Sequence, residues 1–492
     1  MACKEIEMQQ TNLLDNEKFK EVVYKPTTVT GPLKSDQDKN KSGFLFLSAF
    51  IVNLLAFSAG VSFSWSSPVI PKLDQPGSDN PLAEPITKAQ ASWVTGILCF
   101  GAGLGPLIAG KLADKIGRKN TLLSIAIPMT LAYIVLGFSS NVNIFYAARL
   151  IKGLGVGSSF AVLPMYLGEI AEDSNRGTIG CLMGVFISIG LLFSYIVGPT
   201  LTVKMFCFAC TLPLITFFFL FYFLVPETPV YLASTGNKNA AQASLMRLRS
   251  KKASEVQQEL MEIVKSSEES NASKGGMKDL FISKGLRKAF IICTGLLLVQ
   301  QVAGINIVLA YMQTIFDAAG GVIPSDIATV VIGVIQVFAT IGTSSVVDRL
   351  GRKLLILGSA IGSCVSLITL GLFFYLNDHK FDVSQLSWLP VASLILYIVV
   401  FNFGLGPLPW AIMGEMFPSS VKSAASALIS CICFMTSFFI TLLFPMLSMH
   451  LGNALTFWLF AGLCGLGIIF IVIVMPETKG KTLSEIQDML SK

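Results

Sequence analysis

The sequence Asp114-Lys115-Ile116-Gly117-Arg118-Lys119 follows one long apolar run, and Asp348-Arg349-Leu350-Gly351-Arg352-Lys353 follows another in the second half of the chain. The two halves also close alike, on Pro226-Glu227-Thr228 and on Pro476-Glu477-Thr478. A single turn of this kind could simply carry anchoring charges at a membrane surface. Two copies at equivalent positions indicate an internal duplication instead. We therefore predict a chain built from two structurally equivalent halves.

Long apolar runs dominate the chain on both sides of a charged interval. The 492 residues are 53% hydrophobic and 13% charged, whereas soluble domains carry about 25% charged residues. Runs long enough to cross a bilayer are expected at Phe44–Ser64, Ser92–Ala113, Leu122–Phe138, Phe145–Leu167, Ile179–Thr200, Met205–Val225, Ala289–Phe316, Ile327–Val347, Leu354–Leu376, Leu389–Met413, Ala424–Leu447 and Ala454–Met475. The sequence predicts an all-α polytopic membrane protein with twelve transmembrane helices in two six-helix halves.

The polar segments complete the expected domain organisation. It comprises a cytoplasmic N-terminal arm (1–42), a first six-helix half (43–225), a cytoplasmic linker with short amphipathic helices (226–288), a second six-helix half (289–475) and a cytoplasmic C-terminal tail (476–492). With both termini in the cytoplasm, the outer loops carry only four basic residues: Lys72, Lys88, Lys204 and Lys380. Cytoplasmic loops hold the excess of Lys and Arg in membrane proteins. We therefore predict a multi-pass plasma membrane protein with both termini cytoplasmic.

The charges and the reactive side chains argue against several functional classes. The net charge of +6 gathers in short loops and terminal segments, where membrane orientation explains it better than nucleic-acid binding. The two histidines, His379 and His450, fall in expected loops, and neither a metal-ligand cluster nor a nucleophile–base pair is visible in the spans. We expect no metal, no cofactor, no nucleic-acid partner and no enzymatic activity. The lipid bilayer and a small molecule are the expected partners, and the oligomeric state stays open.

Three amide side chains interrupt the first span of the second half, in Gln300-Gln301-Val302-Ala303-Gly304-Ile305-Asn306. Amides are costly in a membrane unless they face something polar. Gly304 lets the helix bend or unwind, and broken spans build substrate sites in transporters. On an unbroken helix Gln301 and Asn306 would lie about 140° apart, so they should not converge. The amides suit a neutral, hydroxyl-rich ligand; the alternative is that they hold helices together.

These motifs, together with Gly404-Leu405-Gly406-Pro407-Leu408-Pro409-Trp410, resemble the sugar porter family of the major facilitator superfamily. The resemblance extends from Phe44 to Leu483. Within the family, Ser64-Trp65-Ser66-Ser67-Pro68 and Pro226-Glu227-Thr228-Pro229-Val230-Tyr231 are similar to the insect facilitated trehalose and glucose transporters. The resemblance implies the major facilitator fold and a sugar substrate.

The resemblance also nominates the residues that bind the sugar. Gln300, Gln301 and Asn306 match the family's sugar-binding amides. Gln336 matches a sugar-contacting asparagine, Asn402 stands where the glucose transporters carry a glutamate, and Trp410 matches the tryptophan beside the sugar. A pyranose shows hydroxyls at its rim and C–H groups on its faces, so amides can bind the rim while an aromatic ring covers a face. Trp410 could instead be an interfacial anchor.

Four lining sites, one of them a pair of residues, depart from the glucose transporters. Gly184 replaces a sugar-contacting glutamine, Ala310 replaces a tyrosine, Asn402 replaces the glutamate, and Cys433-Phe434 replace an Asn-Trp pair. The family assignment does not depend on them, but glucose as the substrate does. A roomier pocket would admit a disaccharide.

Charged residues recur at matched positions near the cytoplasmic ends of the spans. Glu169 is followed by Arg176, and Glu415 by Lys422, with the same spacing. In the family these carboxylates meet the arginines of the Gly-Arg loops and close the cytoplasmic side. The implied gate residues are Glu169, Arg118, Arg176, Asp348, Arg352, Glu415 and Lys422. Alternatively, each could simply extend to water from a helix end. Arg149, inside a span, needs a partner that the sequence does not name.

The resemblance implies a facilitative transporter that moves a neutral sugar, trehalose or a hexose such as glucose, by alternating access. A proton-coupled symporter is the first alternative, and it would need a buried carboxylate near the site. Phe44–Ser64 contains no acidic residue, and Ser58 stands near the position where proton-coupled relatives carry an aspartate. A sugar sensor that barely transports is the second alternative, although sensors usually carry a signalling extension. The sequence does not decide which sugar moves.

Overall fold

A computed structural model describes residues 43–77, 80–82, 84–172, 174–272, 279–320, 323–478, 485 and 489–490, with the backbone alone at 269–272, 279, 344–350 and 419. The described helices belong to one compact unit, Ser42–Lys492. The expected N-terminal arm, most of the expected C-terminal tail and the Asp348 side chain lie outside what the structure describes.

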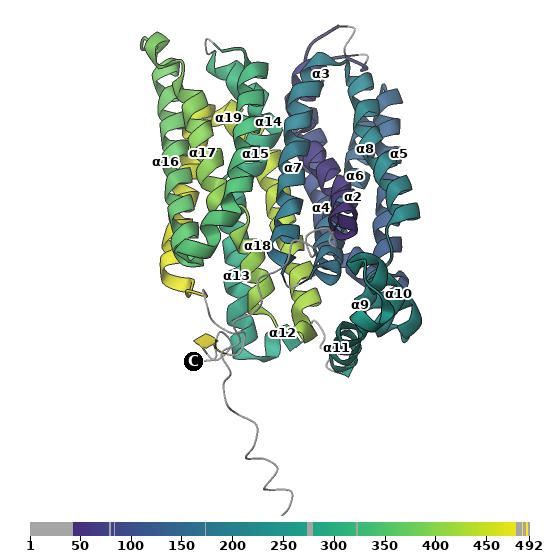
Figure 1. The fold of residues 1–492 in the computed structure, drawn as a ribbon. Helices are drawn as coiled ribbons and strands as arrows, with labels where there is room; N and C mark the ends of the chain where they lie inside the picture. The colour runs from purple at the N-terminus through teal and green to yellow at the C-terminus, as the bar shows by residue number, and fades with distance from the viewer. Residues whose placement is uncertain are drawn as a thin grey trace, which may run out of the picture. The chain divides into compact units, whose positions relative to one another are not determined.

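The first half consists of seven helices that make six spans (Figure 1). They are α2 (Gly43–Ser64), α3 (Ser66–Leu73), α4 (Lys88–Ile116), α5 (Arg118–Phe138), α6 (Val142–Ile170), α7 (Arg176–Thr200) and α8 (Val203–Leu224). Helices satisfy every backbone hydrogen bond internally, as a bilayer requires. Helix α3 continues α2 beyond Trp65, so Gly43–Leu73 forms one span. A capping box begins α4, because Thr87 accepts the N–H of Gln90 while the Gln90 side chain accepts that of Thr87.

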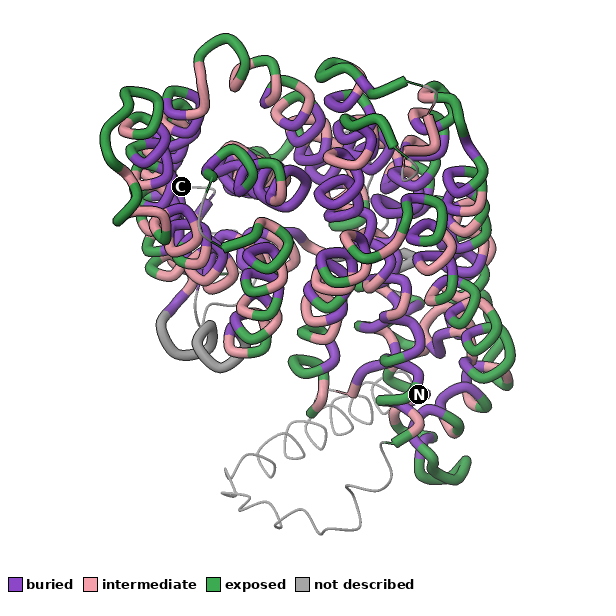
Figure 2. Tube along the Cα trace, turned by 90° about the horizontal axis from the view of Figure 1, so that it is seen from above, coloured by how far each residue is buried: buried purple, intermediate pink, exposed green. Residues whose placement is uncertain are grey.

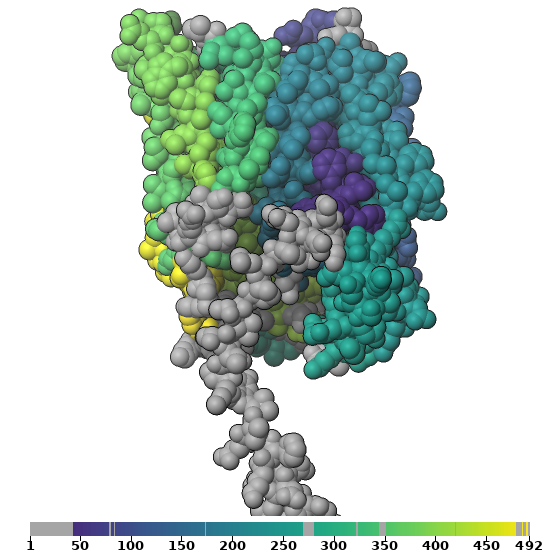
Figure 3. All heavy atoms as spheres, in the orientation of Figure 1, coloured from purple at the N-terminus to yellow at the C-terminus, as the bar shows by residue number. Residues whose placement is uncertain are grey.

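Four helices occupy the charged interval between the halves: α9 (Pro229–Ser234), α10 (Lys238–Arg249), α11 (Ala253–Ala272) and α12 (Asp279–Ile282). Buried Arg249 fixes α10 to the first half, since its Nη1 donates to Ile170 O at 2.8 Å. The same guanidinium pairs with Glu259 at 2.7 Å and with Glu172 at 3.4 Å. The space-filling view shows α9–α11 as a teal surface at one end of the first half (Figure 3).

The second half repeats the arrangement with α13 (Lys284–Val302), α14 (Ile305–Ala319), α15 (Ser325–Leu350), α16 (Arg352–Asp378), α17 (Leu389–Phe403), α18 (Leu408–Met416) and α19 (Ser419–Val474). The described residues contain 11 helical segments long and apolar enough to span a membrane, one fewer than predicted. The last, Ser420–Val474, has 55 residues, and would measure about 80 Å if straight. Gly452, with φ 80°, breaks it between the two predicted runs. The segment therefore supplies two crossings.

The two halves pack through α4 against α19 and through α7 against α15. Figure 1 shows α7 beside α15 where the blue and green halves meet. Figure 2 shows buried residues where helices face one another and exposed ones on the outward faces. Many outward residues are large and apolar, such as Leu131, Leu466 and Ile473, which fits contact with lipid tails. Inside the first half, a Cβ on Gly153 would lie 2.0 Å from Leu98 O, so glycine permits the close contact of α6 with α4.

Two spans of the second half are broken near the middle of the bundle. Gly304, with φ 88°, separates α13 from α14, and Tyr311 inside α14 has non-helical angles. The stretch from Gly404 to Pro407 separates α17 from α18, because the prolines that follow Gly404 cannot supply helical N–H groups. These breaks free backbone carbonyls and position the side chains described next.

Candidate functional site

The amides of Gln301 and Asn306 meet across the break at Gly304. The Asn306 Nδ2 group donates to Gln301 Oε1 at 2.6 Å and to Ser437 Oγ at 2.7 Å. The expectation that the two side chains would not converge is wrong. It assumed an unbroken helix, whereas Gly304 adopts a left-handed conformation that turns the start of α14 back toward Gln301.

Gln300 reaches the second broken span. Its Nε2 donates to Leu405 O at 2.6 Å and to Gly406 O at 2.7 Å, carbonyls that the break between α17 and α18 leaves without helical donors. The Nε2 group of Gln301 lies 3.1 Å from Cys433 Sγ. Gln300 and Gln301 are each 5% exposed. In this conformation the amides hold helices together, and a bound ligand would have to exchange with some of these partners.

Gln336 and Asn402 form a second polar group with residues that the sequence did not nominate. The hydroxyl of Thr340 donates to Asn402 Oδ1 at 3.1 Å and lies 2.8 Å from Ser188 Oγ, which belongs to the first half. Gln336 is buried, and its Oε1 has no hydrogen-bond partner among the described atoms. Buried acceptors rarely stay unpaired. Gln336 Oε1 is therefore a buried acceptor that lacks a donor among the described atoms in this conformation.

The departure at Gly184 leaves a position with one near neighbour. A Cβ on Gly184 would lie 3.3 Å from Thr340 Cγ2, a tight contact, and within 4 Å of no other described atom outside its two chain neighbours and its own helix backbone. The methyl group of Thr340, which belongs to the second half, therefore limits this position on one side. The expectation of a roomier pocket stays a prediction.

Four aromatic rings from both halves gather beside the amides. Trp410 of α18 lies 5.8 Å from Phe160 of α6 and 6.2 Å from Phe434 of α19, between ring centroids. Phe160 lies 5.8 Å from Phe434 and 6.0 Å from Phe63 of α2. Cys433, the neighbour of Phe434, contacts Gln301. Trp410 was nominated from the sequence, and Phe434 was noted there as a departure from the glucose transporters. Phe63 and Phe160 are isolated phenylalanines in apolar spans, which give no signal that they converge.

Hydroxyl groups of the first half close the end opposite the repeated Gly-Arg loops. Ser66 Oγ donates to Ala310 O at 3.2 Å, and Tyr195 OH donates to Leu309 O at 3.2 Å. Tyr311 has φ −120°, which interrupts the helix. In an unbroken helix, backbone N–H groups would donate to these two carbonyls. Gln313 N donates to Ser67 Oγ at 3.2 Å. The broken α14 is therefore hydrogen-bonded to α3 and α7 in this conformation.

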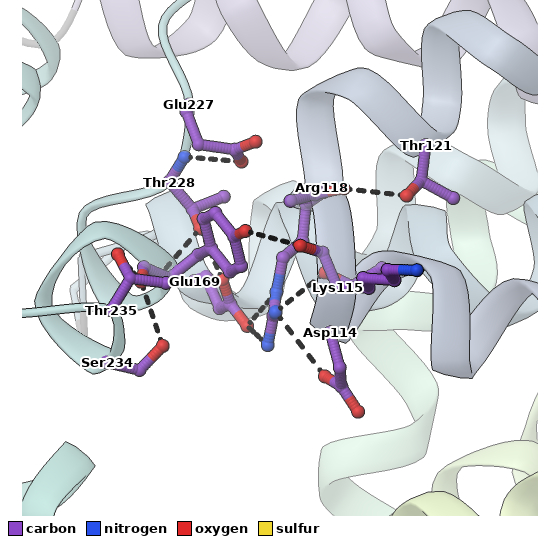
Figure 4. A network of polar contacts seen from close by, with 12 residues as sticks. Asp114, Lys115, Arg118, Thr121, Glu169, Glu227, Thr228, Ser234 and Thr235 are labelled. Atoms are coloured by element: carbon purple, nitrogen blue, oxygen red, sulfur yellow. Dashed lines mark hydrogen bonds and ion pairs between the residues drawn. The ribbon is translucent and has the colours of Figure 1, made fainter.

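The nominated charges of the first half form a compact network (Figure 4). Arg118 donates from Nε to Glu169 Oε1 at 2.9 Å, and its Nη2 lies 2.9 Å from the same oxygen. Its Nη1 lies 3.5 Å from Asp114 Oδ1. The hydroxyl of Thr228 donates to the other oxygen of Glu169. Figure 4 shows the Arg118 guanidinium between Glu169 and Asp114.

The second half repeats this network. Arg352 Nη2 lies 3.4 Å from Glu415 Oε1, and Thr478 Oγ1 donates to Glu415 Oε2 at 3.3 Å. Glu477 accepts the backbone N–H groups of Arg352 and Lys353, each at 3.1 Å. The region that contains these groups is called the charged end below.

Glu227 occupies in the first half the position that Glu477 has in the second half, as an acceptor of backbone N–H groups. It accepts the N–H of Lys119 through both oxygens, at 3.1 and 2.9 Å. Burial raises the pKa of the Glu227 carboxyl, although the N–H groups of Thr228 and Lys119 favour its ionised form. Gly117, with φ 94°, makes room, because a Cβ there would lie 2.2 Å from Glu227 Oε2. The closing Pro-Glu-Thr motif of each half is thus part of the charged network of that half. The repetition of the motif in the sequence did not reveal this role.

Of the three remaining nominations, Lys422 interacts electrostatically with both Glu415 and Arg176. Arg176 is exposed on α7. Lys422 is exposed and donates to Gly414 O at 2.7 Å, and the Asp348 side chain lies outside the described residues. Arg149, whose partner the sequence could not name, donates to Val94 O at 3.1 Å and to Ser62 O at 2.8 Å.

Comparison with known proteins supports one family. The family described as "Sugar (and other) transporter" matches residues 34–490. The facilitated trehalose transporter Tret1 of Culex quinquefasciatus is 34% identical over 444 residues, which cover 90% of this chain and 84% of that protein. Tret1 of Bombyx mori is 33% identical over 463 residues, covering 94% and 89%. Tret1 of Anopheles gambiae is 34% identical over 90% of this chain, which spans only 55% of that longer protein.

Solved structures share the fold. The partially occluded inward-open conformation of the xylose transporter XylE from E. coli superposes with a TM-score of 0.75 at 23% identity, covering 90% of this chain and all of that one. XylE in a structure with 6-bromo-6-deoxy-D-glucose gives a TM-score of 0.73 over 92% of this chain and all of that one, also at 23% identity. By its family match and its fold, the chain belongs to the sugar transporter family, a family of multi-pass membrane transporters and not of enzymes, and has the major facilitator architecture of two six-helix halves.

Proposed function

We propose that this protein is a facilitative uniporter that moves a neutral sugar, trehalose or a hexose such as glucose, across the plasma membrane by alternating access. The observation that carries the proposal is the convergence of uncharged amides at the broken α13–α14 span, where Asn306 lies 2.6 Å from Gln301. Gln336 adds a buried acceptor that has no hydrogen-bond partner in the part of the chain that the structure describes. Amides can both donate to and accept from sugar hydroxyls without binding ions.

The arrangement of the contacts supports alternating access. Each charged network, such as Arg118 with Glu169, lies within one half and stiffens it. The hydrogen bonds between halves near Ala310 and Leu309 each involve a hydroxyl group. Such bonds contribute only about 0.5–1.5 kcal/mol each, so two rigid halves can exchange them for solvent as the site opens. The charged end takes the cytoplasmic side by the distribution of Lys and Arg, with both termini there.

Uniport is favoured over proton coupling by the surroundings of Arg149. Its guanidinium is satisfied by backbone carbonyls of Val94 and Ser62 and lies 5.1 Å from the Trp65 ring. No carboxylate among the described residues pairs with it. Ser58, at the position where proton-coupled relatives carry an aspartate, is buried and cannot carry a proton at physiological pH. The gate carboxylates Glu169 and Glu415 are already engaged by arginines.

The test uses purified protein in sealed vesicles with labelled glucose and labelled trehalose, measured separately. A uniporter takes up its sugar saturably and stops when the inner and outer concentrations are equal. Vesicles without protein set the background. A protein that binds a sugar without uptake would support the sensor alternative, and one that neither binds nor carries either sugar would overturn the proposal.

A further inference from the structure

Phe160, on α6 of the first half, contacts aromatic rings of both halves. The proposed function gives this residue no role. Its ring lies 5.8 Å from Trp410 and 5.8 Å from Phe434, both of the second half, and 6.0 Å from Phe63 of its own half. Phe63 in turn stacks on Phe434 at 6.5 Å with an interplanar angle of 13°. The four rings, called the aromatic layer below, therefore contact one another across the interface of the halves.

The aromatic layer lies between the amides and the charged end. Gln301 contacts Cys433, which precedes Phe434 in α19, so the amides border the layer. Along α6, Glu169 comes nine residues after Phe160, a distance of about 14 Å on a helix. Along α18, Glu415 comes five residues after Trp410, about 8 Å away. A sugar that leaves the amides toward the charged end must pass the layer.

Beyond the layer, toward the charged end, the surface of the protein is hollowed. The next turns of α6 and the facing residues of α7 line a depression, made by Pro164, Leu167, Gly168, Arg176, Gly180 and Met183. A Cβ on Gly168 or Gly180 would meet no atom within 4 Å. Phe160 is half-buried. Phe160 thus belongs to the aromatic layer and lies one helical turn from Pro164, the first residue of α6 that lines the depression.

The layer also limits the length of a bound sugar. One pyranose ring can place its hydroxyl rim on the amides and a C–H face on Trp410. The second ring of a disaccharide would extend into the space that Phe160 and Phe434 fill. At the other polar group, Thr340 occupies the space beside Gly184. The site is therefore bounded by Phe160 of the first half and by Thr340 and Phe434 of the second half.

We propose that Phe160 is a specificity-determining residue, which closes the aromatic layer so that the transporter selects a sugar of one ring over a disaccharide. This inference rests on the proposed function and names its substrate class. Removing the ring opens a direct path from the amides to the depression. One methylene more or less in an apolar pocket already separates substrates by about tenfold to 200-fold, so we expect a whole second ring to give a preference of about tenfold or more.

The experiment compares wild type, Phe160→Ala, Phe160→Leu and Phe219→Ala in sealed vesicles, with kcat/KM measured for labelled glucose and labelled trehalose. Phe219 lies on α8 and is 56% exposed, so its variant removes a ring that faces away from the layer. We expect wild type and Phe219→Ala to prefer glucose by about tenfold or more. Phe160→Ala should lose most of this preference through faster trehalose uptake, and Phe160→Leu should keep part of it.

The outcomes separate the two proposals. A wild type that carries neither sugar overturns the proposed function and this inference with it. A wild type that carries both sugars equally well overturns the inference alone. So does a Phe160→Ala variant that transports glucose with the wild-type preference. If Phe160→Ala does not fold, Phe160→Leu decides, because an unchanged preference there shows that the Phe160 ring does not set the selection.

Discussion

Asn306 donates to Gln301 at 2.6 Å, although the two residues would lie on different faces of an unbroken helix. The left-handed turn at Gly304 brings them together. Gln300, one turn before the break, donates to the carbonyls of Leu405 and Gly406 in the other broken span. The glycine conformation therefore brings Asn306 to Gln301, while Gln300 ties α13 to the break between α17 and α18.

Replacing Gln301 with alanine should weaken sugar binding. The substitution removes a candidate ligand group and the acceptor of Asn306, and we expect a loss of about 1–3 kcal/mol in sugar affinity. Titration of purified protein with sugar, followed by intrinsic fluorescence, measures the effect. The exposed Gln75 provides the matched control, since Gln75→Ala removes an amide outside the site. Unchanged affinity and transport in Gln301→Ala would mean that the amides only hold helices together.

Breaking the charged network of the second half should open the charged end. Arg352→Ala removes the partner of Glu415, and Glu415→Gln removes the charge that Arg352 needs. We expect α18 to loosen from α16 and the depression to become more accessible. A cysteine placed at Gly180, in a background with the exposed Cys181→Ser, reports this through its rate of labelling. Labelling at the parent rate in both variants would argue against a gate.

Gly117 should tolerate substitution poorly, whereas Gly168 should tolerate it well. Alanine at Gly117 must adopt φ 94° and would place its Cβ 2.2 Å from Glu227 Oε2. Such backbone conformations cost about 1–3 kcal/mol outside glycine. Gly168 lies in α6 with nothing near its Cβ position, so alanine there should be neutral or slightly stabilising. Thermal unfolding in detergent compares the two, and equal midpoints would contradict the strain argument.

The spans and the duplication could be predicted from the sequence, because apolar run length and repeated Gly-Arg turns are local signals. The break at Gly304 was also expected, but its consequence for Asn306 was not, since a pattern does not fix the direction of a turn. Thr340, Ser188 and Phe160 carry no local signal at all. Their importance comes from contacts between the halves, which only the three-dimensional arrangement reveals.

Removing the hydroxyl of Tyr195 should favour the conformation in which the site is open at the end of the protein opposite the charged end. Tyr195→Phe deletes the donor to Leu309 O while keeping the ring. The loss of about 0.5–1.5 kcal/mol should shift the two states by about twofold to tenfold. Gln75, just after α3, and Ala318, near the end of α14, are both exposed. Spin labels at these two positions report the separation of the two helices. A distance distribution identical to that of the unmodified chain would remove Tyr195 from the closure.

Transport should run only down the sugar gradient. Coupling to protons needs a titratable group that the moving halves expose to each side in turn, and carboxylates inside the membrane usually take that role. The first span, α2, contains no acidic residue, and Arg149 is satisfied by the carbonyls of Val94 and Ser62. The carboxylates of Glu169 and Glu415 lie at the charged end, each paired with an arginine within its own half.

The decisive measurement is uptake into sealed vesicles under an inward proton gradient with equal sugar on both sides. We expect no net accumulation, because no described group near the amides can return a proton to the other side. A protonophore should then leave the uptake unchanged. Accumulation above the outside concentration that the protonophore abolishes would establish a symporter. Lys152 would then be the first residue to replace. It is fully buried, its amine lies 3.1 Å from the Tyr133 ring centroid, and that amine has no hydrogen-bond partner among the described residues.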